Sequence, residues 1–465
     1  MAVDENVLKE LAGCFPPEAP LFAVGGFCRD KLLGVTPRDV DVCAKLALDD
    51  IRTLLKNTDF VISDRCLRLG TAVISKDGFS AEYTRFRTDS YPEGKGDHRP
   101  DGVKFTDDMR ADARRRDFAC NAVYLNVRTG EYADFSDGKG DIRRKVLRAA
   151  DNPEKVFGED GLRVLRLARF HAELGFGVDE ETFAAAKRNA WRVKDITRER
   201  VFAELDKIIV ADTAYPELGV KDGHVRGLEM LDRLGLLPLL LPELDALKGL
   251  QQSPKHHVFD AYRHSVVAYE VSAPDIRWAA LLHDIGKRPT MERQGNMYGH
   301  DAVGAEMTKV RLAALGMPKT RAERTAKLIA CHMADLKEDT SENKLRLYIV
   351  DHADVMEQLV ELKRADGYAT KGRPVPEARI GRLWREMLHD GTPFAVTDLP
   401  VGGDDAAAVG LAGVEIGRAL DDLRREAVVN PLLRERDRAR EFLARRAQKV
   451  LSAREGGEDA HRRKK

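Results

Sequence analysis

One stretch decides the fold of the N-terminal third: Phe22-Ala-Val-Gly25-Gly26-Phe-Cys-Arg29-Asp30-Lys-Leu-Leu-Gly34. It predicts a short strand, a tight turn at the two glycines, and a helix. Glycines at such a junction let the backbone approach a ligand, and the following helix presents free N–H groups and a partial positive charge to it. The stretch therefore predicts a phosphate-binding turn, although paired glycines are by themselves common in turns.

Two carboxylates, Asp39 and Asp41, follow in a run that predicts a strand. Residues i and i+2 of a strand face the same side, so the two carboxylates should project together. Adjacent carboxylates repel each other unless a divalent cation lies between them. We expect the pair to hold Mg²⁺, which would activate an attacking hydroxyl and neutralise a leaving pyrophosphate. The alternative is a pair of solvent-facing acids on an edge strand.

Glu82 lies in a later alternating run, Ala81–Phe86, that also predicts a strand. It is a candidate third carboxylate on the strand next to the two aspartates. An ion pair with Arg85 or Arg87 explains it equally well, and the sequence leaves both interpretations open.

The composition indicates a folded chain of several domains. Its 465 residues suggest about three domains, and 43% hydrophobic with 33% charged residues exclude disorder over most of the length. The formal net charge is zero, so bulk charge gives no argument for nucleic-acid binding, although local basic stripes are compatible with it. The longest strongly apolar stretch, Leu234–Leu241, is too short for a membrane span, and we expect no membrane association.

The cysteines and the N-terminal residues predict a cytoplasmic protein. The six cysteines show no CxxC spacing, and a disulfide framework is not expected in a chain of this length. Met1–Glu10 is acidic and polar rather than basic and then apolar, so we expect no secretory signal.

The pattern of the chain changes near Pro153. Before it, short β-like runs alternate with turns, and after it apolar residues recur at helical spacing almost to the end. We therefore predict an α+β head with a small mixed sheet, followed by mostly helical parts. The predicted strands are Leu21–Val24, Val40–Cys43, Thr71–Ser75, Ala81–Phe86 and Ala122–Val127.

Further blocks give the N-terminal motif a family resemblance. Gly25-Gly26-x-x-Arg29-Asp30 with Asp39-x-Asp41 resembles the nucleotidyltransferase fold of the DNA polymerase β superfamily. Four later blocks resemble, in order, those of class II tRNA nucleotidyltransferases (CCA-adding enzymes) and bacterial poly(A) polymerases. They are Arg115-Arg116-Asp117-Phe118-Ala-Cys-Asn121-Ala122, Asp134-x-x-x-Gly138-x-x-Asp141, Glu159-Asp160-x-x-Arg163, and Thr197-Arg198-Glu199-Arg200 through Glu204.

The resemblance implies an activity and a set of site residues. It implies transfer of C, C and A from CTP and ATP to the 3′ end of tRNA, with Mg²⁺ held by the catalytic carboxylates Asp39 and Asp41. It places Arg116 and Asp117 at the ribose of the incoming nucleotide, and it makes the Asp134–Asp141 block a hinge. The nucleotide-binding residues that it implies are Gly25, Gly26, Arg29, Arg116, Asp117, Asn121, Asp160, Arg163 and Arg166.

The fourth block has a chemical rationale of its own. Asp160 and Arg163 are three residues apart in a strongly helical stretch and are expected to share a helix face. Cytosine and adenine both present an exocyclic amine beside a ring-nitrogen acceptor, which a carboxylate and a guanidinium match. Guanine and uracil present a carbonyl where the amine should be. The pair could therefore accept C and A without a template, whereas spacing alone favours a surface ion pair.

The choice between CCA addition and poly(A) addition depends on one segment. Poly(A) polymerases of the group are expected to carry a basic Gly-Arg-Arg-Phe-like core near the third strand. Here the comparable residues are Cys66-Leu-Arg-Leu-Gly70-Thr71-Ala-Val, which resemble the Gly-Thr form of CCA-adding enzymes. This favours CCA addition, with poly(A) addition, CC-only or A-only addition as alternatives.

A second pattern lies in the helical part of the chain. Imidazole and carboxylate groups are good ligands for divalent transition metals, and their order here resembles the HD-domain phosphohydrolases over roughly residues 257–366. Other histidines, such as His352, do not fit the pattern. The alternatives are an HD domain without activity, and a chain that is chiefly a phosphohydrolase. The candidate ligands are His264, His283, Asp284, His300, His332 and Asp366.

The C-terminal part combines a glycine-rich turn, Gly413–Gly417, with a basic stretch. Leu423–Lys449 holds nine Lys or Arg against four Asp or Glu. With the family resemblance, this stretch is expected to contact the tRNA backbone rather than to be only a solvated helix face. We expect no membrane partner, and the sequence allows no protein partner to be inferred. The expected domains are a head (1–150), a neck (151–225), a body containing the HD domain (226–370), and a tail (371–465).

Overall fold

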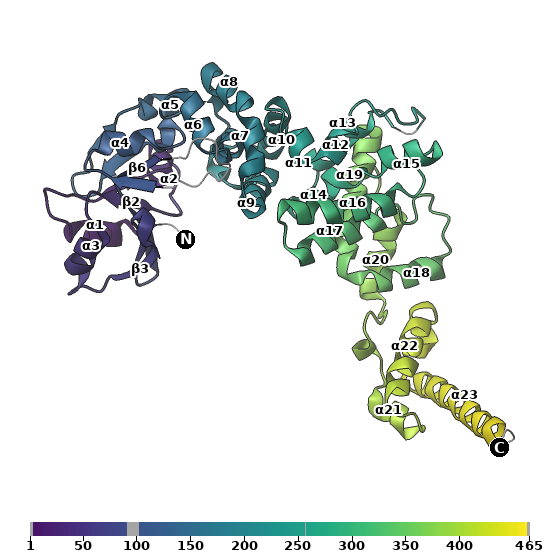
Figure 1. Cartoon of the computed structure of the whole chain (residues 1–465). Helices are drawn as coiled ribbons and strands as arrows, with labels where there is room; N and C mark the ends of the chain where they lie inside the picture. Colours follow the sequence, from purple (N-terminus) through teal and green to yellow (C-terminus); the bar gives the residue numbers. More distant parts are fainter. Residues whose placement is uncertain (1–2, 91–101, 256, 463–465) are drawn as a thin grey trace. The chain divides into compact units, whose positions relative to one another are not determined.

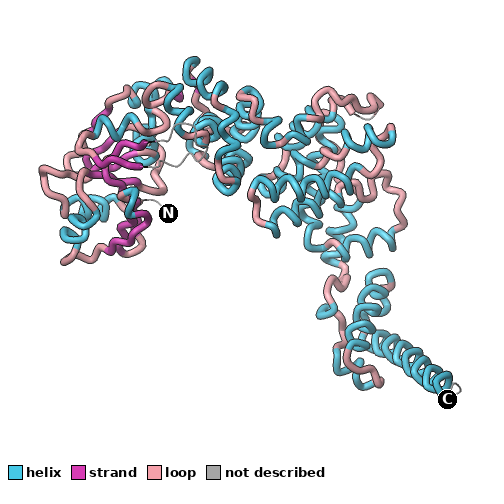
Figure 2. Tube along the Cα trace, viewed as in Figure 1, coloured by secondary structure: helices cyan, strands magenta, loops and turns pink. Residues whose placement is uncertain are grey.

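The computed structural model describes residues 3–90, 102–255 and 257–462 and divides into two compact units. The first unit comprises Met1–Ala246 with Val310–Lys319, and the second comprises Leu247–Lys309 with Thr320–Lys465. The strands, magenta in Figure 2, lie in the N-terminal part, and the elements of the rest are helices, drawn in cyan. Figure 1 labels the helices and strands. The expected α+β head followed by helical parts is confirmed. The finer division into four parts stays a prediction.

The head is built on a mixed sheet. Within the described residues its strand order is β3-β4-β5-β2-β1-β8-β9. Neighbours are antiparallel except β2 and β5, which are parallel. The strands of this sheet are β1 (Phe22–Val24), β2 (Asp41–Ala44), β3 (Val61–Cys66), β4 (Thr71–Lys76), β5 (Phe79–Arg85), β8 (Val123–Asn126) and β9 (Tyr132–Asp134). Two short pairs are β6 (Arg87–Ser90) with β7 (Gly102–Phe105), and β10 (Val146–Leu147) with β11 (Gly177–Val178).

Helices complete the first unit. Those of the head are α1 (Glu5–Gly13), α2 (Gly26–Leu33), α3 (Leu48–Leu55), α4 (Met109–Arg114) and α5 (Gly138–Arg144). Those that follow are α6 (Pro153–Glu159), α7 (Leu162–Leu174), α8 (Glu180–Arg188), α9 (Arg198–Ile209), α10 (Gly223–Arg233), α11 (Leu237–Leu240) and α12 (Pro242–Asp245). A buried ion-pair network joins α7 to α9, in which Arg169 donates to Glu204 at 2.6 Å and to Glu173 at 2.8 Å.

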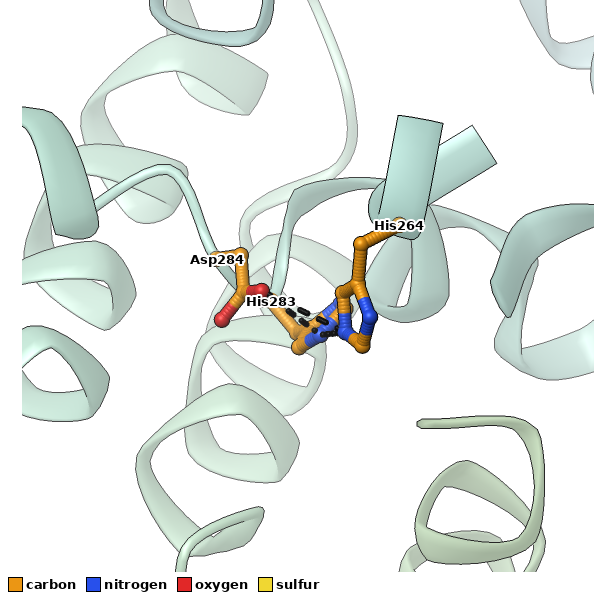
Figure 3. A group of neighbouring side chains, drawn as sticks. All are labelled: His264, His283 and Asp284. Carbon is orange, nitrogen blue, oxygen red and sulfur yellow. Dashed lines mark hydrogen bonds and ion pairs between the residues drawn. The ribbon is translucent and has the colours of Figure 1, made fainter. Parts of the chain in front are cut away.

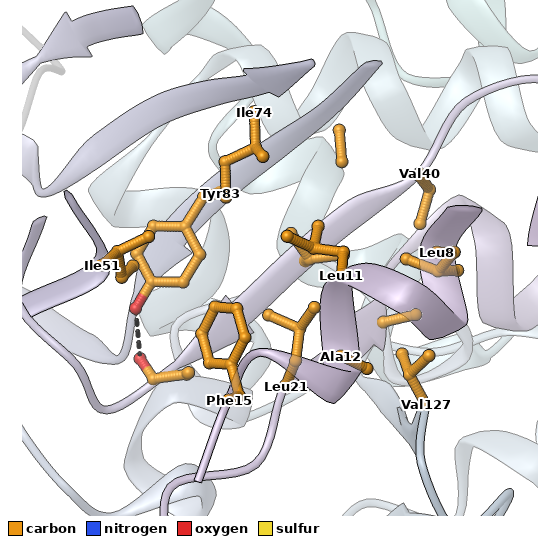
Figure 4. Packing of buried hydrophobic residues seen from close by; sticks show 14 of the residues in the cluster. Leu8, Leu11, Ala12, Phe15, Leu21, Val40, Ile51, Ile74, Tyr83 and Val127 are labelled. Atoms are coloured by element: carbon orange, nitrogen blue, oxygen red, sulfur yellow. Dashed lines mark hydrogen bonds between the residues drawn. The ribbon is translucent and has the colours of Figure 1, made fainter. Parts of the chain in front are cut away.

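The larger apolar core of the head occupies one face of the sheet. Residues at alternate positions of the strands, such as Ile74 and Tyr83, pack there against Leu8 and Leu11 of α1 and Ile51 of α3 (Figure 4). The intervening residues of the same strands face the opposite side, because successive side chains of a strand alternate. That opposite face carries a second, smaller apolar cluster, which includes Val24, Cys43 and Tyr124, beside the polar side chains of Asp41 and Glu82.

Asp134 organises the turn between β9 and α5. Its carboxylate accepts hydrogen bonds from the backbone N–H groups of Ser136, Gly138 and Lys139, at 3.2, 2.9 and 2.8 Å. These contacts satisfy donors at the helix start that have no partner within the helix. Gly138 packs so closely on Ala119 that an added Cβ would overlap its carbonyl oxygen. The expected hinge block is therefore a capped and tightly packed turn in this structure.

The second unit is helical throughout the described residues, and α16 and α17 each also contribute residues to the first unit. None of the described helices combines the length and the apolar character that crossing a bilayer requires. Residues Leu420 and Leu443 belong to a separate apolar core in the C-terminal part. The helices are α13 (Ala261–Glu270), α14 (Arg277–Leu282), α15 (Lys287–Gln294), α16 (His300–Leu315), α17 (Lys319–Cys331), α18 (Glu342–Asp351), α19 (Met356–Lys371), α20 (Arg379–His389), α21 (Gly403–Ala408), α22 (Val414–Val429) and α23 (Arg436–Arg462).

The five predicted strands are present as β1, β2, β4, β5 and β8, with ends that differ by one or two residues. The sequence analysis missed β3, β6, β7, β9, β10 and β11. The edge strand β3 is largely exposed and carries Ser63, Asp64 and Arg65, so it lacks the apolar alternation that identifies a half-buried strand.

Replacing Gly138 with alanine tests the packing of the hinge block. The new Cβ would overlap the backbone of Ala119, and overpacking of this kind costs about 1–3 kcal/mol of unfolding free energy. Gly13→Ala is the matched control, because nothing lies within 4 Å of a Cβ there. Hydrogen exchange of the β1 and β8 amides in the full chain measures both variants. Equal protection in the two would contradict the prediction.

Candidate functional site

The glycine turn lies beside the second aspartate. Gly25 follows β1 with a φ of +75°, a left-handed conformation that glycine adopts without strain. A Cβ atom there would lie 3.3 Å from Oδ2 of Asp41. Helix α2 begins at Gly26, and the backbone N–H of Arg29 donates to the carbonyl of Gly25. The predicted strand, turn and helix are present, and the absence of a side chain at Gly25 keeps the space next to Asp41 open.

The carboxylates lie at the start of β2 and on the strand beside it. Asp41 is in register with Val24 of β1 and with Glu82 of the parallel strand β5, so Glu82 does lie on the neighbouring strand. Asp39 lies two residues before β2, so the expectation that both aspartates share one strand is wrong, although both are exposed. Solvent reaches Asp41, yet protein atoms surround it. Burial raises the pKa of Asp41 to about 6. The negative charges of Glu82 and Asp39 add to this increase, and the positive charge of Arg116 opposes it.

A pocket of about 450 Å³ is lined by the carboxylates of Asp41 and Glu82 and by arginines. Its charged lining residues are Asp41, Glu82, Arg65, Arg87, Arg115 and Arg116. Positive side chains therefore outnumber negative ones by two. Arginine presents a planar fork of donors that matches phosphate oxygens. The pocket has the charge and the donors to bind a polyphosphate next to a pair of carboxylates.

Glu82 forms an ion pair with Arg65 of β3. The two partners considered from the sequence are engaged elsewhere: Arg85 donates to a backbone carbonyl, and Arg87 donates to Asp89 at 2.8 Å. The expected ion pair of Glu82 with either residue is therefore wrong. The sequence analysis did not identify Arg65, Arg87 and Arg115 as pocket residues, and only their proximity to predicted strands or to the second block could have indicated them.

Gly70 precedes Thr71, which also lines the pocket. The φ of Gly70 is +64°, and a Cβ there would lie 2.6 Å from the ring of Phe105. Both facts require glycine at this position. Packing therefore accounts for the Gly70-Thr71 form that the sequence analysis associated with CCA addition.

Arg29 is buried and its guanidinium is held by protein side chains. It donates to Asp30 at 2.6 and 2.9 Å, to Oδ1 of Asn121 at 3.0 Å, and to the hydroxyl of Tyr215 at 2.7 Å. These contacts link α2 to the segment after α4 and to the helical part that contains Tyr215. Contact of Arg29 with a triphosphate stays a prediction.

Three of the predicted nucleotide-binding residues form one cluster. Oδ2 of Asp117 accepts from Nε of Arg166 at 2.7 Å, and Oδ1 accepts from the backbone of Phe118 at 2.8 Å and from Nδ2 of Asn121 at 3.2 Å. Burial raises the pKa of Asp117, but Arg166 and these hydrogen bonds outweigh it and lower the pKa to about 2. Asp117 is therefore a carboxylate anion that holds the second block against α7.

Asp160 and Arg163 do not share a helix face, contrary to the prediction. Asp160 ends α6 in an extended conformation, and Arg163 lies in the first turn of α7. The helix is interrupted between these two residues at Gly161. A Cβ atom at Gly161 would lie 2.6 Å from the carbonyl oxygen of Arg192. Arg163 is buried and donates to the carbonyls of Val156 and Arg115, at 3.0 and 2.6 Å. Their role in base selection stays a prediction.

The second unit brings the six predicted metal ligands together. His264, His283 and Asp284 form one group, which Figure 3 shows, and Asp284, His300 and His332 form another. Asp366 Oδ1 lies 3.0 Å from Nε2 of His264. Asp284 belongs to both groups: its Oδ2 lies 3.3 Å from His283, and its Oδ1 lies 3.2 Å from His300.

Backbone contacts orient three of these histidines. The Nδ1 atoms of His283, His300 and His332 lie 2.8, 2.8 and 2.6 Å from the carbonyls of the residues three positions earlier. Donation from Nδ1 leaves Nε2 with a lone pair directed at the cluster, which is the tautomer that a metal requires. Nε2 of His300 and Nε2 of His332 are 3.2 Å apart. A cation between such nitrogens relieves their repulsion, so the donor set fits divalent transition metals.

Lys287 is a further residue of this cluster that the sequence analysis missed. Its buried Nζ donates to Oδ2 of Asp284 and to Oε1 of Gln252, both at 2.6 Å. It lies three residues after Asp284 at the start of α15, and that spacing was the available signal. The lysine supplies a positive charge next to the carboxylate that the two groups share.

The basic stretch near the C-terminus is partly neutralised by ion pairs. Arg440 pairs with Asp405 at 2.8 Å, and Arg424 pairs with Asp421 at 2.8 Å. An open groove of about 460 Å³ includes Arg418 at the start of α22. Fewer unpaired charges are available for a polyanion than the residue count indicates.

Three family models match successive parts of the chain. The poly A polymerase head domain matches residues 21–148, the probable RNA and SrmB-binding site of polymerase A matches residues 175–248, and the HD domain matches residues 256–359. Together they define a nucleotidyltransferase head followed by an RNA-binding segment and an HD domain.

Relatives along most of the chain identify the family. An A-adding tRNA nucleotidyltransferase of Deinococcus radiodurans is 31% identical, with 87% of this chain and 90% of the relative covered. A CC-adding tRNA nucleotidyltransferase of Thermus thermophilus is also 31% identical, with 91% and 92% covered. The chain belongs to the tRNA nucleotidyltransferase family. The crystal structure of the Bacillus stearothermophilus CCA-adding enzyme in complex with CTP shares the fold, with a TM-score of 0.68, 23% identity, and 96% and 98% of the chains covered.

The contacts of Asp117 predict an effect on stability that depends on pH. A pKa of about 2, below the ordinary 3.8, means that the ionised carboxylate stabilises the fold above about pH 4 and that this contribution is lost as the pH falls towards 2. Asp117→Asn should therefore lower the unfolding free energy by about 2 kcal/mol at pH 7. Urea unfolding at pH 7 and pH 3 measures this, and a difference from wild type that does not shrink at the lower pH would contradict it.

Proposed function

We propose that the chain adds C, C and A in turn to the 3′ end of tRNA from CTP and ATP, without a nucleic-acid template and with release of pyrophosphate. The observation that carries this proposal is that Asp41 and Glu82 lie side by side on neighbouring strands in an arginine-lined pocket. The named activities of the relatives, A-adding, CC-adding and CCA-adding, support the substrate class. We also propose that it acts in the cytoplasm, which fits six free cysteines.

Asp39 and Asp41 would hold Mg²⁺, with Glu82 adjacent to Asp41. Carboxylate oxygens are the ligands that this ion prefers, and a cation relieves the repulsion between neighbouring carboxylates. When bound, Mg²⁺ lowers the pKa of the attacking 3′ hydroxyl and neutralises charge on the leaving pyrophosphate.

The side chains around the carboxylates would bind and orient the nucleotide. The pocket arginines supply the donors for the triphosphate, and the open backbone at Gly25 and Gly26 lets it lie close to Asp41. Arg116 lines the pocket, and Asp117 follows it in the second block and is held against α7, so these two residues would position the ribose. These roles follow from the location of the residues around one pocket.

Base selection would rest on Asp160 and Arg163. A carboxylate accepts from the exocyclic amine of C or A, and a guanidinium donates to the ring nitrogen. Because Arg163 donates to the carbonyl of Arg115, base binding by this pair requires Arg163 to exchange that contact for the nucleotide. Arg166, which is partly exposed on α7, would contribute a further positive charge.

The C-terminal helices would hold the tRNA. Arginines of α22 and α23 can contact the phosphates of the RNA backbone, and such contacts do not depend on the base sequence. Contacts of this kind suit the recognition of a structured RNA by its shape. The groove beside Arg418 is a place for such a contact.

The experiment that tests the proposal follows single-nucleotide extension. Purified full-length protein is incubated with Mg²⁺, CTP, ATP and tRNA transcripts that end at position 73, 74 or 75. Extension that stops after CCA supports the proposal. Addition that stops after CC, or occurs only on tRNA ending in CC, replaces it with a split activity, and a long A ladder replaces it with poly(A) addition. No extension would leave the HD site as the principal activity.

Asp41→Ala should abolish nucleotide addition and leave tRNA binding nearly intact, because the pocket loses a metal ligand while the C-terminal helices are unchanged. Asp49→Ala is the matched control, since Asp49 is an exposed aspartate of α3 whose partner is Arg52. The extension assay and filter binding of labelled tRNA measure both properties. Extension by the Asp41→Ala variant at the wild-type rate would refute the assignment.

We further propose that the HD cluster acts as a phosphohydrolase site, in which the two ligand groups that share Asp284 would each hold a divalent transition-metal ion. Support comes from the two ligand groups that share Asp284 and from the Nε2 atoms directed at them. Bound metal would activate water for attack on a phosphate ester.

Metal content after incubation with Mn²⁺ and desalting tests whether both ligand groups bind an ion. Wild-type protein should retain about two ions per chain, and His300→Ala should retain about one, because each group supplies its own ion with ligands. His352→Ala is the control, because His352 stacks on Tyr348 outside both groups. Protein without bound Mn²⁺ would contradict the proposal, as would loss of nucleotide addition in a folded His283→Ala/Asp284→Ala variant.

A further inference from the structure

We propose that Asp112 is a positioning residue for the nucleotide pocket: with Tyr124 it holds Arg115 and Arg116 in place to bind the phosphates of the incoming nucleoside triphosphate. The inference rests on the proposed nucleotide addition and concerns a residue outside the catalytic carboxylates. Asp112 lies in α4, three residues before Arg115, and is fully buried.

The carboxylate of Asp112 is the common acceptor for both arginines. Its Oδ1 accepts from Nε of Arg115 at 2.8 Å and from the backbone N–H of Arg87 at 3.2 Å. Its Oδ2 accepts from Nη2 of Arg116 at 3.2 Å and from the hydroxyl of Tyr124 at 2.6 Å. One buried side chain thus contacts three residues that line the pocket.

Tyr124 completes the arrangement from β8. Its hydroxyl accepts from Nε of Arg116 at 3.1 Å while it donates to Asp112. The guanidinium carbon of Arg116 also lies 5.2 Å from the centre of the tyrosine ring. Arg116 is therefore held along one edge and one face. Among the described residues its Nη1 has no hydrogen-bond partner, so that this donor is available to a ligand in the pocket.

The charge of Asp112 matters as well as its position. Burial raises its pKa, but Arg115, Arg116 and the Tyr124 hydroxyl outweigh burial and lower it to about 2. Asp112 is therefore an anion at neutral pH and offsets the repulsion between two neighbouring guanidinium groups. Without that anion the arginines would be less well oriented before the nucleotide arrives, and ordering them would reduce the affinity for the phosphates.

Two variants test the role, and a third controls for structure. Asp112→Asn removes the charge, and Tyr124→Phe removes only the hydroxyl that joins Asp112 to Arg116. Tyr83→Phe is the matched control: Tyr83 is an equally buried tyrosine of the same sheet, and its hydroxyl bonds to the carbonyls of Ala44 and Leu46 on the opposite face. Each full-length variant is assayed for kcat and KM with CTP, for Ki with pyrophosphate, and for thermal unfolding.

A positioning role predicts a specific pattern. Asp112→Asn should raise the KM for CTP and the Ki for pyrophosphate together by about tenfold or more, with kcat within about threefold of wild type, because charge-assisted anchoring is lost in the free enzyme. Tyr124→Phe should shift both constants in the same direction by a smaller factor. Tyr83→Phe should leave both at wild-type values even where it lowers the unfolding temperature.

The outcomes separate this inference from the function on which it rests. A wild-type protein that adds no nucleotide refutes the proposed function. An active wild type, with KM and Ki unchanged in both folded variants, refutes only the role of Asp112. Equal KM increases in Tyr124→Phe and Tyr83→Phe would also refute it, because they would point to a general loss of packing. If Asp112→Asn does not fold, Tyr124→Phe against Tyr83→Phe decides the question.

Discussion

Two carboxylates held side by side on parallel strands are the constraint on which the head depends. Asp41 and Glu82 are in register on β2 and β5, so the hydrogen bonds of the sheet itself keep two like charges together. Their repulsion is tolerated because solvent reaches Asp41, Arg65 pairs with Glu82, and Arg116 contributes opposite charge. The glycine turn keeps space free next to Asp41, and the buried contacts behind the arginines keep the positive charges in place.

The fold could be predicted wherever apolar periodicity accompanies burial. The strands that contain Val24 and Val42 were identified as short apolar runs between turn residues, and the strand that contains Tyr83 was identified by its alternation. The exposed edge strand β3 gave no such signal. The break between Asp160 and Arg163 could not be predicted either, because Gly161 is needed there only through its contact with the backbone of Arg192, which lies far along the sequence.

The sequence predicted which residues form the candidate sites better than it predicted how their side chains are oriented. The order of the histidines and aspartates identified the HD cluster, but the carbonyls that direct the Nε2 atoms inward belong to local backbone geometry that no motif encodes. In the head, Asp117 and Arg166 were predicted to bind a nucleotide, but the sequence did not show that they are hydrogen-bonded to each other. Spacing shows which groups are present, whereas tertiary contacts decide which of their atoms are free.

Gly70 shows how far such motifs can discriminate between relatives. Its left-handed backbone and its contact with Phe105 exclude any side chain there, so architecture alone selects this glycine before any substrate binds. Any chain that keeps the same ring against the same turn needs it, whether its product ends in C or in A. The glycine therefore reflects the packing of the head and does not by itself distinguish one end product from another.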